Sequence, residues 1–168
     1  MKGSHPLKGH KISKHKIKRY EDASQKIQNI FESCAQQALT GDMRAKHCAC
    51  LVRKGEMIMI ECNHAGNCHG FSTHAEATIH KKMTRHTHNK KKERYTYDLY
   101  IIRYSERSGF MNSKPCSECT RLIKNEMYYV NKVIYSYDNK HYIIEHKDTL
   151  KTSHISNGTS NFRKRSNC

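Results

Sequence analysis

The stretch VNKVIYSYDNKHYIIEH (residues 130–146) decides the fold of this 168-residue chain. Two runs rich in Val, Ile and Tyr, VNKVIYSY and HYIIEH, are separated only by DNK. These residue types favour β-strands. Because a parallel crossover needs a dozen or more residues, so short a link permits only an antiparallel hairpin. The sequence therefore predicts that the last two strands of the domain are antiparallel neighbours.

The residues before this hairpin predict alternating helices and strands. A helix is expected over 115–127, with Pro115 at its first position, where proline is favoured. Upstream of it, SERSGFMNSK (105–114) is expected to be a loop and YTYDLYIIRYS (95–105) a buried strand. A helix from about 74 to 86 is expected to be capped by Ser72 or Thr73.

Nearer the start of the chain, AKHCACLV (45–52) and MIMIECN (57–63) flank the turn sequence RKGE, which predicts another hairpin. A first helix over 23–39 has apolar residues at steps of three and four, with Asp22 as its cap and Gly41 at its end. The complete order is helix, strand, strand, helix, strand, helix, strand, strand. This order predicts an α/β fold: a three-layer α/β/α sandwich on a five-stranded mixed sheet, with the last two strands antiparallel.

A chain of 168 residues with 36% apolar composition suits one core. We assign residues 20–146 to the domain and residues 1–19 to a basic, disordered N-terminal arm. Residues 147–168 are expected to form a polar, basic and loose tail, in which Ile155 could dock. The sequence has no long apolar run and no signal-like segment, so we expect no membrane contact, no secretion, and a cytoplasmic or nuclear location.

The net charge of +16 attracts polyanions. Residues 1–19 hold seven Lys/Arg and no acid, and residues 81–94 hold seven against one Glu. These two segments could track the phosphates of a nucleic acid. The alternative is that they are solvated surface, and the same applies to the His-rich stretch 80–88, which is more typical of a basic helix face than of a metal site.

Two short motifs carry the chemistry. HAE (74–76) and PCSEC (115–119) supply His74, Cys116 and Cys119 as ligands for zinc. Three protein ligands leave one position of a tetrahedral zinc open, as in catalytic sites. Both motifs lie at predicted helix starts, where unpaired N–H groups and the helix dipole favour thiolates. Glu76 is not needed as a ligand and can therefore act in proton transfer.

The motifs H-x-E and P-C-x-x-C form the signature of zinc-dependent nucleobase deaminases, and residues 21–146 resemble the cytidine deaminase superfamily. The resemblance implies one Zn²⁺ per chain on His74, Cys116 and Cys119, with Glu76 as the proton shuttle. It implies hydrolysis of a cytosine-type base to uracil with release of ammonia. The resemblance also makes a homo-oligomer plausible.

Substrate contacts are expected from four residues. Asn63 ends a strand where relatives place an Asn that contacts ribose or base, and the carbonyls around Ser113 and Lys114 resemble those that bind the departing amino group. Ala75 and Phe71 complete the predicted set, with Phe71 as a ring that could stack on a base.

Three hypotheses for function remain open. The leading one is deamination of a nucleoside, nucleotide or related small molecule. Ala65 stands where enzymes acting on free cytidine usually have Glu, which weakens the nucleoside case, while the antiparallel last strand resembles the free-substrate branch. The alternatives are deamination of a base within RNA or DNA, and a non-catalytic, zinc-stabilised nucleic-acid-binding protein.

A second metal site is an open alternative for the segment CNHAGNCH (62–69). Its candidate ligands are Cys62, His64, Cys68 and His69. Their spacing matches no recognised pattern.

Overall fold

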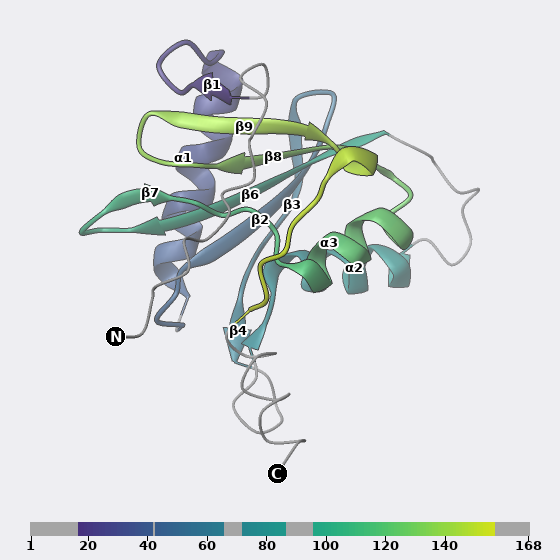
Figure 1. The fold of residues 1–168 in the computed structure, drawn as a ribbon. Helices are drawn as coiled ribbons and strands as arrows, with labels where there is room; N and C mark the ends of the chain where they lie inside the picture. Colours follow the sequence, from purple (N-terminus) through teal and green to yellow (C-terminus); the bar gives the residue numbers. More distant parts are fainter. Residues whose placement is uncertain (1–16, 42, 66–71, 87–95, 157–168) are drawn as a thin grey trace, which may run out of the picture.

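The computed structural model describes residues 17–41, 43–65, 72–86 and 96–156 (Figure 1). One mixed sheet lies between α1 (Gln25–Thr40) on one face and α2 (Ala75–His86) and α3 (Ser117–Asn125) on the other. The described strands of this sheet are β1 (Ile17–Arg19), β2 (His47–Arg53), β3 (Glu56–Cys62), β6 (Tyr97–Ser105), β7 (Gly109–Met111), β8 (Val130–Ser136) and β9 (His141–His146). The predicted three-layer α/β/α class is confirmed.

The sheet order is β1-β9-β8-β6-β2-β3, with β7 paired to β6. β8 runs parallel to β6 and antiparallel to β9, so the predicted antiparallel final pair is confirmed. β2 is antiparallel to both β3 and β6. The β2–β3 hairpin turns at Lys54 and Gly55, whose φ angles of 52° and 81° match the turn that suits the twist of a two-residue hairpin.

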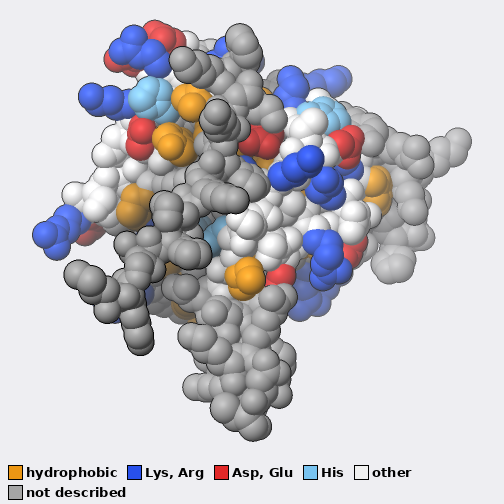
Figure 2. Space-filling model, in the orientation of Figure 1, with side chains coloured by type: hydrophobic (Ala, Val, Ile, Leu, Met, Phe, Trp, Pro, Cys, Tyr) orange, Lys and Arg blue, Asp and Glu red, His pale blue; other side chains and the backbone are white. Residues whose placement is uncertain are grey.

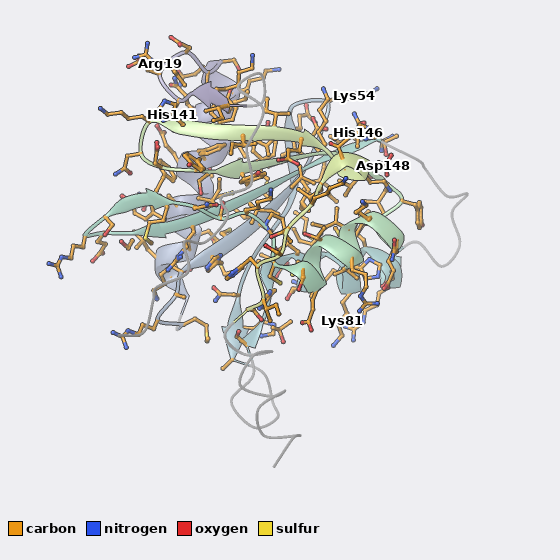
Figure 3. The ribbon with its side chains drawn as sticks, in the orientation of Figure 1. Arg19, Lys54, Lys81, His141, His146 and Asp148 are labelled. Carbon is orange, nitrogen blue, oxygen red and sulfur yellow. The ribbon has the colours of Figure 1, made fainter. Side chains whose placement is uncertain are left out.

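The predicted number of five strands is wrong, because two short strands extend the sheet to seven. β7 lies within the predicted loop 105–114. β1 lies in the segment predicted to be a disordered arm, where Ile17 pairs with Ile143 and Arg19 with His141 (Figure 3). The open edge of β9 accepts these three residues, so the described part of the arm is ordered; residues 1–16 lie outside the described residues.

Both faces of the central strands are buried, which explains their continuous apolar sequences. In β2, Cys48 and Cys50 face α1, whereas Ala49 and Leu51 face α2 and α3. The tyrosines follow the same alternation: Tyr135 lies in the core on the α2/α3 side, and the core on the α1 side contains Tyr100 and Tyr142.

The starts of α2 and α3, which hold the predicted metal ligands, differ from the predicted helix starts. His74 occupies the cap position of α2, because its carbonyl accepts a 3.1 Å bond from the N–H of Thr78. Ser72 and Thr73, the predicted caps, instead form β5 (Ser72–Thr73), which pairs with β4 (His64–Ala65). Cys116 is the N-cap of α3, so Pro115 precedes the helix rather than occupying its first position. Similarly, α1 starts after Ser24 rather than Asp22, and its predicted end at Gly41 is confirmed.

The segment after β9 packs on the domain at its start. It forms a short 3₁₀ helix, η2 (Lys147–Thr149), where His146 Nδ1 lies 3.4 Å from Asp148 Oδ2 (Figure 3). Leu150 is 1% exposed in the core on the α2/α3 side, whereas Ile155, the predicted docking residue, is 39% exposed. The chain then runs beside α3 towards β4 (Figure 1). The expected loose tail is thus packed on the domain over residues 147–150, whereas residues 151–156 have no helix or strand and are half-buried or exposed.

None of the helices in the described residues combines the length and the apolar character that a membrane crossing requires.

Candidate active site

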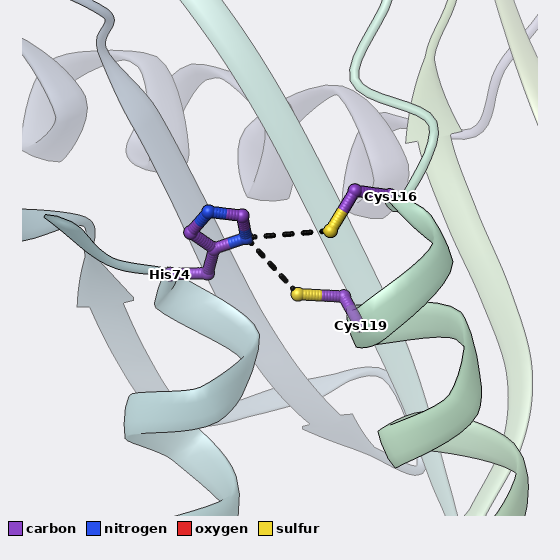
Figure 4. Close-up of side chains that lie close together, drawn as sticks. All are labelled: His74, Cys116 and Cys119. Carbon is purple, nitrogen blue, oxygen red and sulfur yellow. Dashed lines mark hydrogen bonds between the residues drawn. The ribbon is translucent and has the colours of Figure 1, made fainter. Parts of the chain in front are cut away.

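The three predicted zinc ligands converge at the starts of two neighbouring helices (Figure 4). His74 precedes the first residue of α2, while Cys116 and Cys119 come from the first turn of α3. His74 Nδ1 lies 3.2 Å from Cys119 Sγ and 3.6 Å from Cys116 Sγ. The three ligand atoms lie within 4.8 Å of one another. The structure thus brings together side chains that are 42 and 45 residues apart in sequence.

This triangle fits a metal ion. A tetrahedral zinc with Zn–S of about 2.3 Å and Zn–N of about 2.05 Å separates neighbouring N and S ligands by about 3.6 Å. The two measured N–S distances lie close to that value. One imidazole and two thiols are also the ligand types that zinc prefers. The residues could therefore hold zinc through three ligands, which leaves one coordination position for a reactant.

Electrostatics favours loss of a thiol proton at this site. A hydrogen bond from the Cys119 thiol, followed by one from His74, lowers the pKa of Cys116 to about 4. The same hydrogen bond raises the pKa of Cys119, and a hydrogen bond to Cys116 raises that of His74. The Cys116 sulfur is thus stabilised as a thiolate, the form that binds metal.

Glu76 lies beside this triangle, one residue into α2. Its side chain is buried, and burial raises the pKa of its carboxyl, with a hydrogen bond to Cys119 acting in the opposite direction. A carboxyl with a raised pKa holds a proton more strongly than an ordinary one and is therefore a better proton acceptor. Glu76 also lines the cavity described next.

A cavity of about 560 Å³ opens beside the triangle. Its size is typical of sites for small ligands. The lining residues that the motifs predicted are His74, Ala75, Glu76, Cys116, Asn63, Ser113 and Lys114. Those that sequence reasoning missed include His47, Arg103, Asn112, Thr152, His154 and Ser156. No motif marks the second group, because strand register and the path of the tail bring its members to the cavity.

The predicted substrate contacts are placed as follows. Asn63 lines the cavity, but its side chain also bridges the chain before β2: Oδ1 accepts from the N–H of His47 at 2.9 Å and Nδ2 donates to the carbonyl of Ala45 at 2.8 Å. The Ser113 hydroxyl donates to the carbonyl of Ile101 at 2.6 Å and its backbone N–H donates to the carbonyl of Ser136 at 2.9 Å, so both of its donors are used within the protein. Phe71 lies outside the described residues.

His47 also lines the cavity. Burial, followed by the positive charge of Arg103, lowers its pKa to about 4. The charges of His74, Cys116 and His154 also act on it, so these groups surround His47. A neutral imidazole both donates and accepts hydrogen bonds, which suits contact with an uncharged polar part of a ligand.

The suggested second metal site is only partly described, since Cys68 and His69 lie outside the described residues. Cys62 donates to the carbonyl of Gln37 at 3.2 Å. Over the described part of the chain, His74, Cys116 and Cys119 form the one group of His, Cys and acidic residues that could hold a metal ion.

Basic residues of the described chain do not gather over one area of the face in Figure 2, where Lys and Arg alternate with acidic and neutral side chains. Lys81, Lys82 and Arg85 lie on the exposed face of α2, as predicted for a solvated helix face, and Lys82 pairs with Glu61 at 2.5 Å. Residues 87–94 of the predicted phosphate-tracking segment lie outside the described residues.

Comparison with known proteins identifies the fold. A scan against protein-family models and a search of curated proteins both give no match. Among solved structures, the cytidine deaminase from Burkholderia pseudomallei matches with a TM-score of 0.57 and 13% identity, over 76% of this chain and 98% of that chain. This likeness shows that the chain has the cytidine deaminase-like fold, as the sequence resemblance predicted.

The dCMP deaminase from the cyanophage S-TIM5 also matches. Its apo form gives a TM-score of 0.47 and 19% identity, over 67% of this chain and 84% of that chain. Its complex with dCMP and dUMP gives a TM-score of 0.49 and 17% identity, over 67% of this chain and 82% of that chain.

Proposed function

We propose that this chain, which has the cytidine deaminase-like fold, is a zinc-dependent hydrolytic deaminase that converts a cytosine-type base of a small molecule to uracil with release of ammonia. The observation that carries this proposal is the buried Glu76 beside three converging zinc ligands at the wall of a cavity. A zinc held only for structure would have four protein ligands and would need no acid beside it.

His74, Cys116 and Cys119 would hold the metal. Zinc on three protein ligands supplies a Lewis acid that makes water a nucleophile at neutral pH. Glu76 would accept the proton of the attacking water at its carboxylate and then donate it to the departing amino nitrogen. Burial assists both steps, because it raises the pKa of the carboxyl towards the working pH. The products are the uracil-type base and ammonia.

The cavity supports a small-molecule substrate. Neutral His47 and the amide of Asn63 offer hydrogen bonds next to the ligand triangle, and the backbone around Ser113 and Lys114 forms the wall on the Cys116 side. These groups suit a base with an exocyclic amino group and the sugar attached to it.

The test is release of ammonia and formation of uracil by zinc-loaded protein. The panel contains cytidine, deoxycytidine, their 5′-monophosphates, cytosine, adenosine, and cytosine-containing RNA and DNA oligonucleotides. Turnover of a small cytosine compound is expected. Turnover of oligonucleotides alone would replace the small-molecule proposal with a polynucleotide deaminase, and no turnover with one zinc bound per chain would support the non-catalytic hypothesis.

Glu76→Gln provides the decisive variant. It should lower the rate about 10²- to 10⁴-fold while keeping the zinc content of the parent, because general acid–base transfer contributes about that factor. Glu118→Gln is the matched control. Glu118 is an exposed acid in the first turn of α3, and its replacement removes the same negative charge as Glu76→Gln does. If Glu76→Gln were as active as the parent, the assigned role of Glu76 would be wrong.

A further inference from the structure

Arg103 presents a positive charge to the cavity without an acidic partner. Its guanidinium lines the cavity, and its Nε is buried without a hydrogen-bond partner. Among the described residues, no Asp or Glu forms an ion pair with it. Buried polar groups are almost always satisfied, and a buried charge most of all. A half-buried arginine that has no acidic partner among the described residues, in the wall of a ligand cavity, therefore indicates that the ligand supplies the anion.

Strand register explains why Arg103 faces the site. Arg103 of β6 is the direct partner of His47 of β2, and the next inward pair on the same face is Ala49 and Ile101. Ala49 and Ile101 belong to the core under α2 and α3. Because residues two apart point to one face of a sheet, His47 and Arg103 continue that face past the core into the cavity.

A second basic group comes from the segment after β9. The carbonyl of His154 accepts a 2.7 Å bond from the N–H of Ser117 at the start of α3, which ties the segment to the cavity wall. Its imidazole lies near enough to lower the pKa of His47, as does Arg103. Among the cavity-lining residues that the structure describes, Glu76 is the only acid, and it lies at the ligand triangle.

From this arrangement we propose that Arg103, assisted by His154, binds a phosphate group of the substrate, so that the substrate is a nucleoside monophosphate rather than a nucleoside. The inference rests on the proposed function. A bound nucleotide would place its base at the triangle, its sugar beside His47 and Asn63, and its phosphate at Arg103. Arginine suits this role because its planar donors match phosphate oxygens in pairs.

The experiment measures binding of the product analogues uridine 5′-monophosphate and uridine to zinc-loaded full-length protein by calorimetry, which needs no turnover. The parent should bind the monophosphate about 10- to 100-fold more tightly than uridine, as expected for charge-assisted hydrogen bonds. Arg103→Gln should abolish this preference, so that the monophosphate binds no more tightly than uridine. Arg103→Lys keeps the positive charge but loses the paired donors of the guanidinium, so it should retain part of the preference for the monophosphate.

Arg107→Gln is the matched control for net charge, because this exposed arginine lies in the turn between β6 and β7. It should preserve the preference for the monophosphate. Equal affinities of the parent for uridine and its monophosphate, or an unchanged preference in Arg103→Gln, would overturn the phosphate site. Tighter binding of a uridine-containing oligonucleotide, weakened equally by Arg103→Gln, would overturn the assignment to a free nucleotide.

The two proposals fail separately. If the parent deaminates cytidine and its monophosphate with equal kcat/KM and shows no binding preference, the deaminase stands and the phosphate site falls. If the parent turns over nothing but still binds the monophosphate through Arg103, the deaminase falls and the phosphate site stands.

Discussion

Replacing His47 with Gln should reduce the loss in the free energy of unfolding that the protein suffers as the pH falls. In the folded state the pKa of His47 is lowered from 6.5 to about 4, first because the ring is buried and then because of the charge of Arg103. A lowered pKa means that the folded state resists protonation more than the unfolded state. Above pH 6.5 both states are neutral and no free energy is lost.

As the pH falls from 6.5 towards 4, the unfolded chain takes up a proton at this ring and the folded chain does not, so the free energy of unfolding decreases. Each unit of pKa difference corresponds to about 1.4 kcal/mol, which gives up to about 3 kcal/mol once the pH is below the folded pKa. Partial exposure of the ring reduces this value. A Gln at position 47 does not titrate and should escape the loss.

The assay is urea denaturation of the parent and His47→Gln, followed by circular dichroism at several pH values between about 7 and 4. Chelator is present throughout, so that release of metal at low pH does not contribute. The difference between the two proteins should change with pH by about 1 to 3 kcal/mol. His64→Gln, at an exposed histidine on β4, should run parallel to the parent. Parallel curves for His47→Gln and the parent would refute the reasoning.

Three further changes test other parts of the structure. Leu150→Ala should lower the free energy of unfolding by about 2 to 5 kcal/mol in urea denaturation, because this leucine is 1% exposed in the core. Gly109→Ala should lower it by about 1 to 3 kcal/mol, because Gly109 has φ 69° and an added Cβ would collide with the side chain of Asn139. Cys119→Ser should reduce bound zinc from one per chain towards none in native mass spectrometry, and chelator should then no longer lower its Tm.

Local signals were sufficient to predict the helices and the longer strands, although they misplaced the caps at the helix starts. The short DNK link decides the antiparallel final pair, and the turn around Gly55 decides the β2–β3 hairpin. The ligand triangle was also predictable, because the two motifs define residue types as well as helix starts. His74, Cys116 and Cys119 could be named without knowing which way their side chains point.

Features that depend on distant partners were not predictable from local patterns. β7 is held by Asn139, whose side chain accepts from the N–H of Phe110 at 2.6 Å and donates to the carbonyl of Ser108 at 2.8 Å, and this residue lies 29 and 31 positions away from them. β1 forms because the edge of β9 is open to it. Arg103 reaches the cavity only through its register with His47, since a single strand does not show which of its residues extends beyond the core.

The N–H of Ser117 donates a hydrogen bond to the carbonyl of His154, which holds residues 150–156 at the wall of the cavity although they are not part of the sheet. This segment is held at one end by Leu150 in the core and near its other end by the start of α3. The four residues between them, 151–154, form no strand pairs. Exchanges within this span can therefore retune which compounds are admitted while the scaffold and the metal ligands remain as they are. Libraries that vary only Thr152 and His154 would be an economical route to altered selectivity.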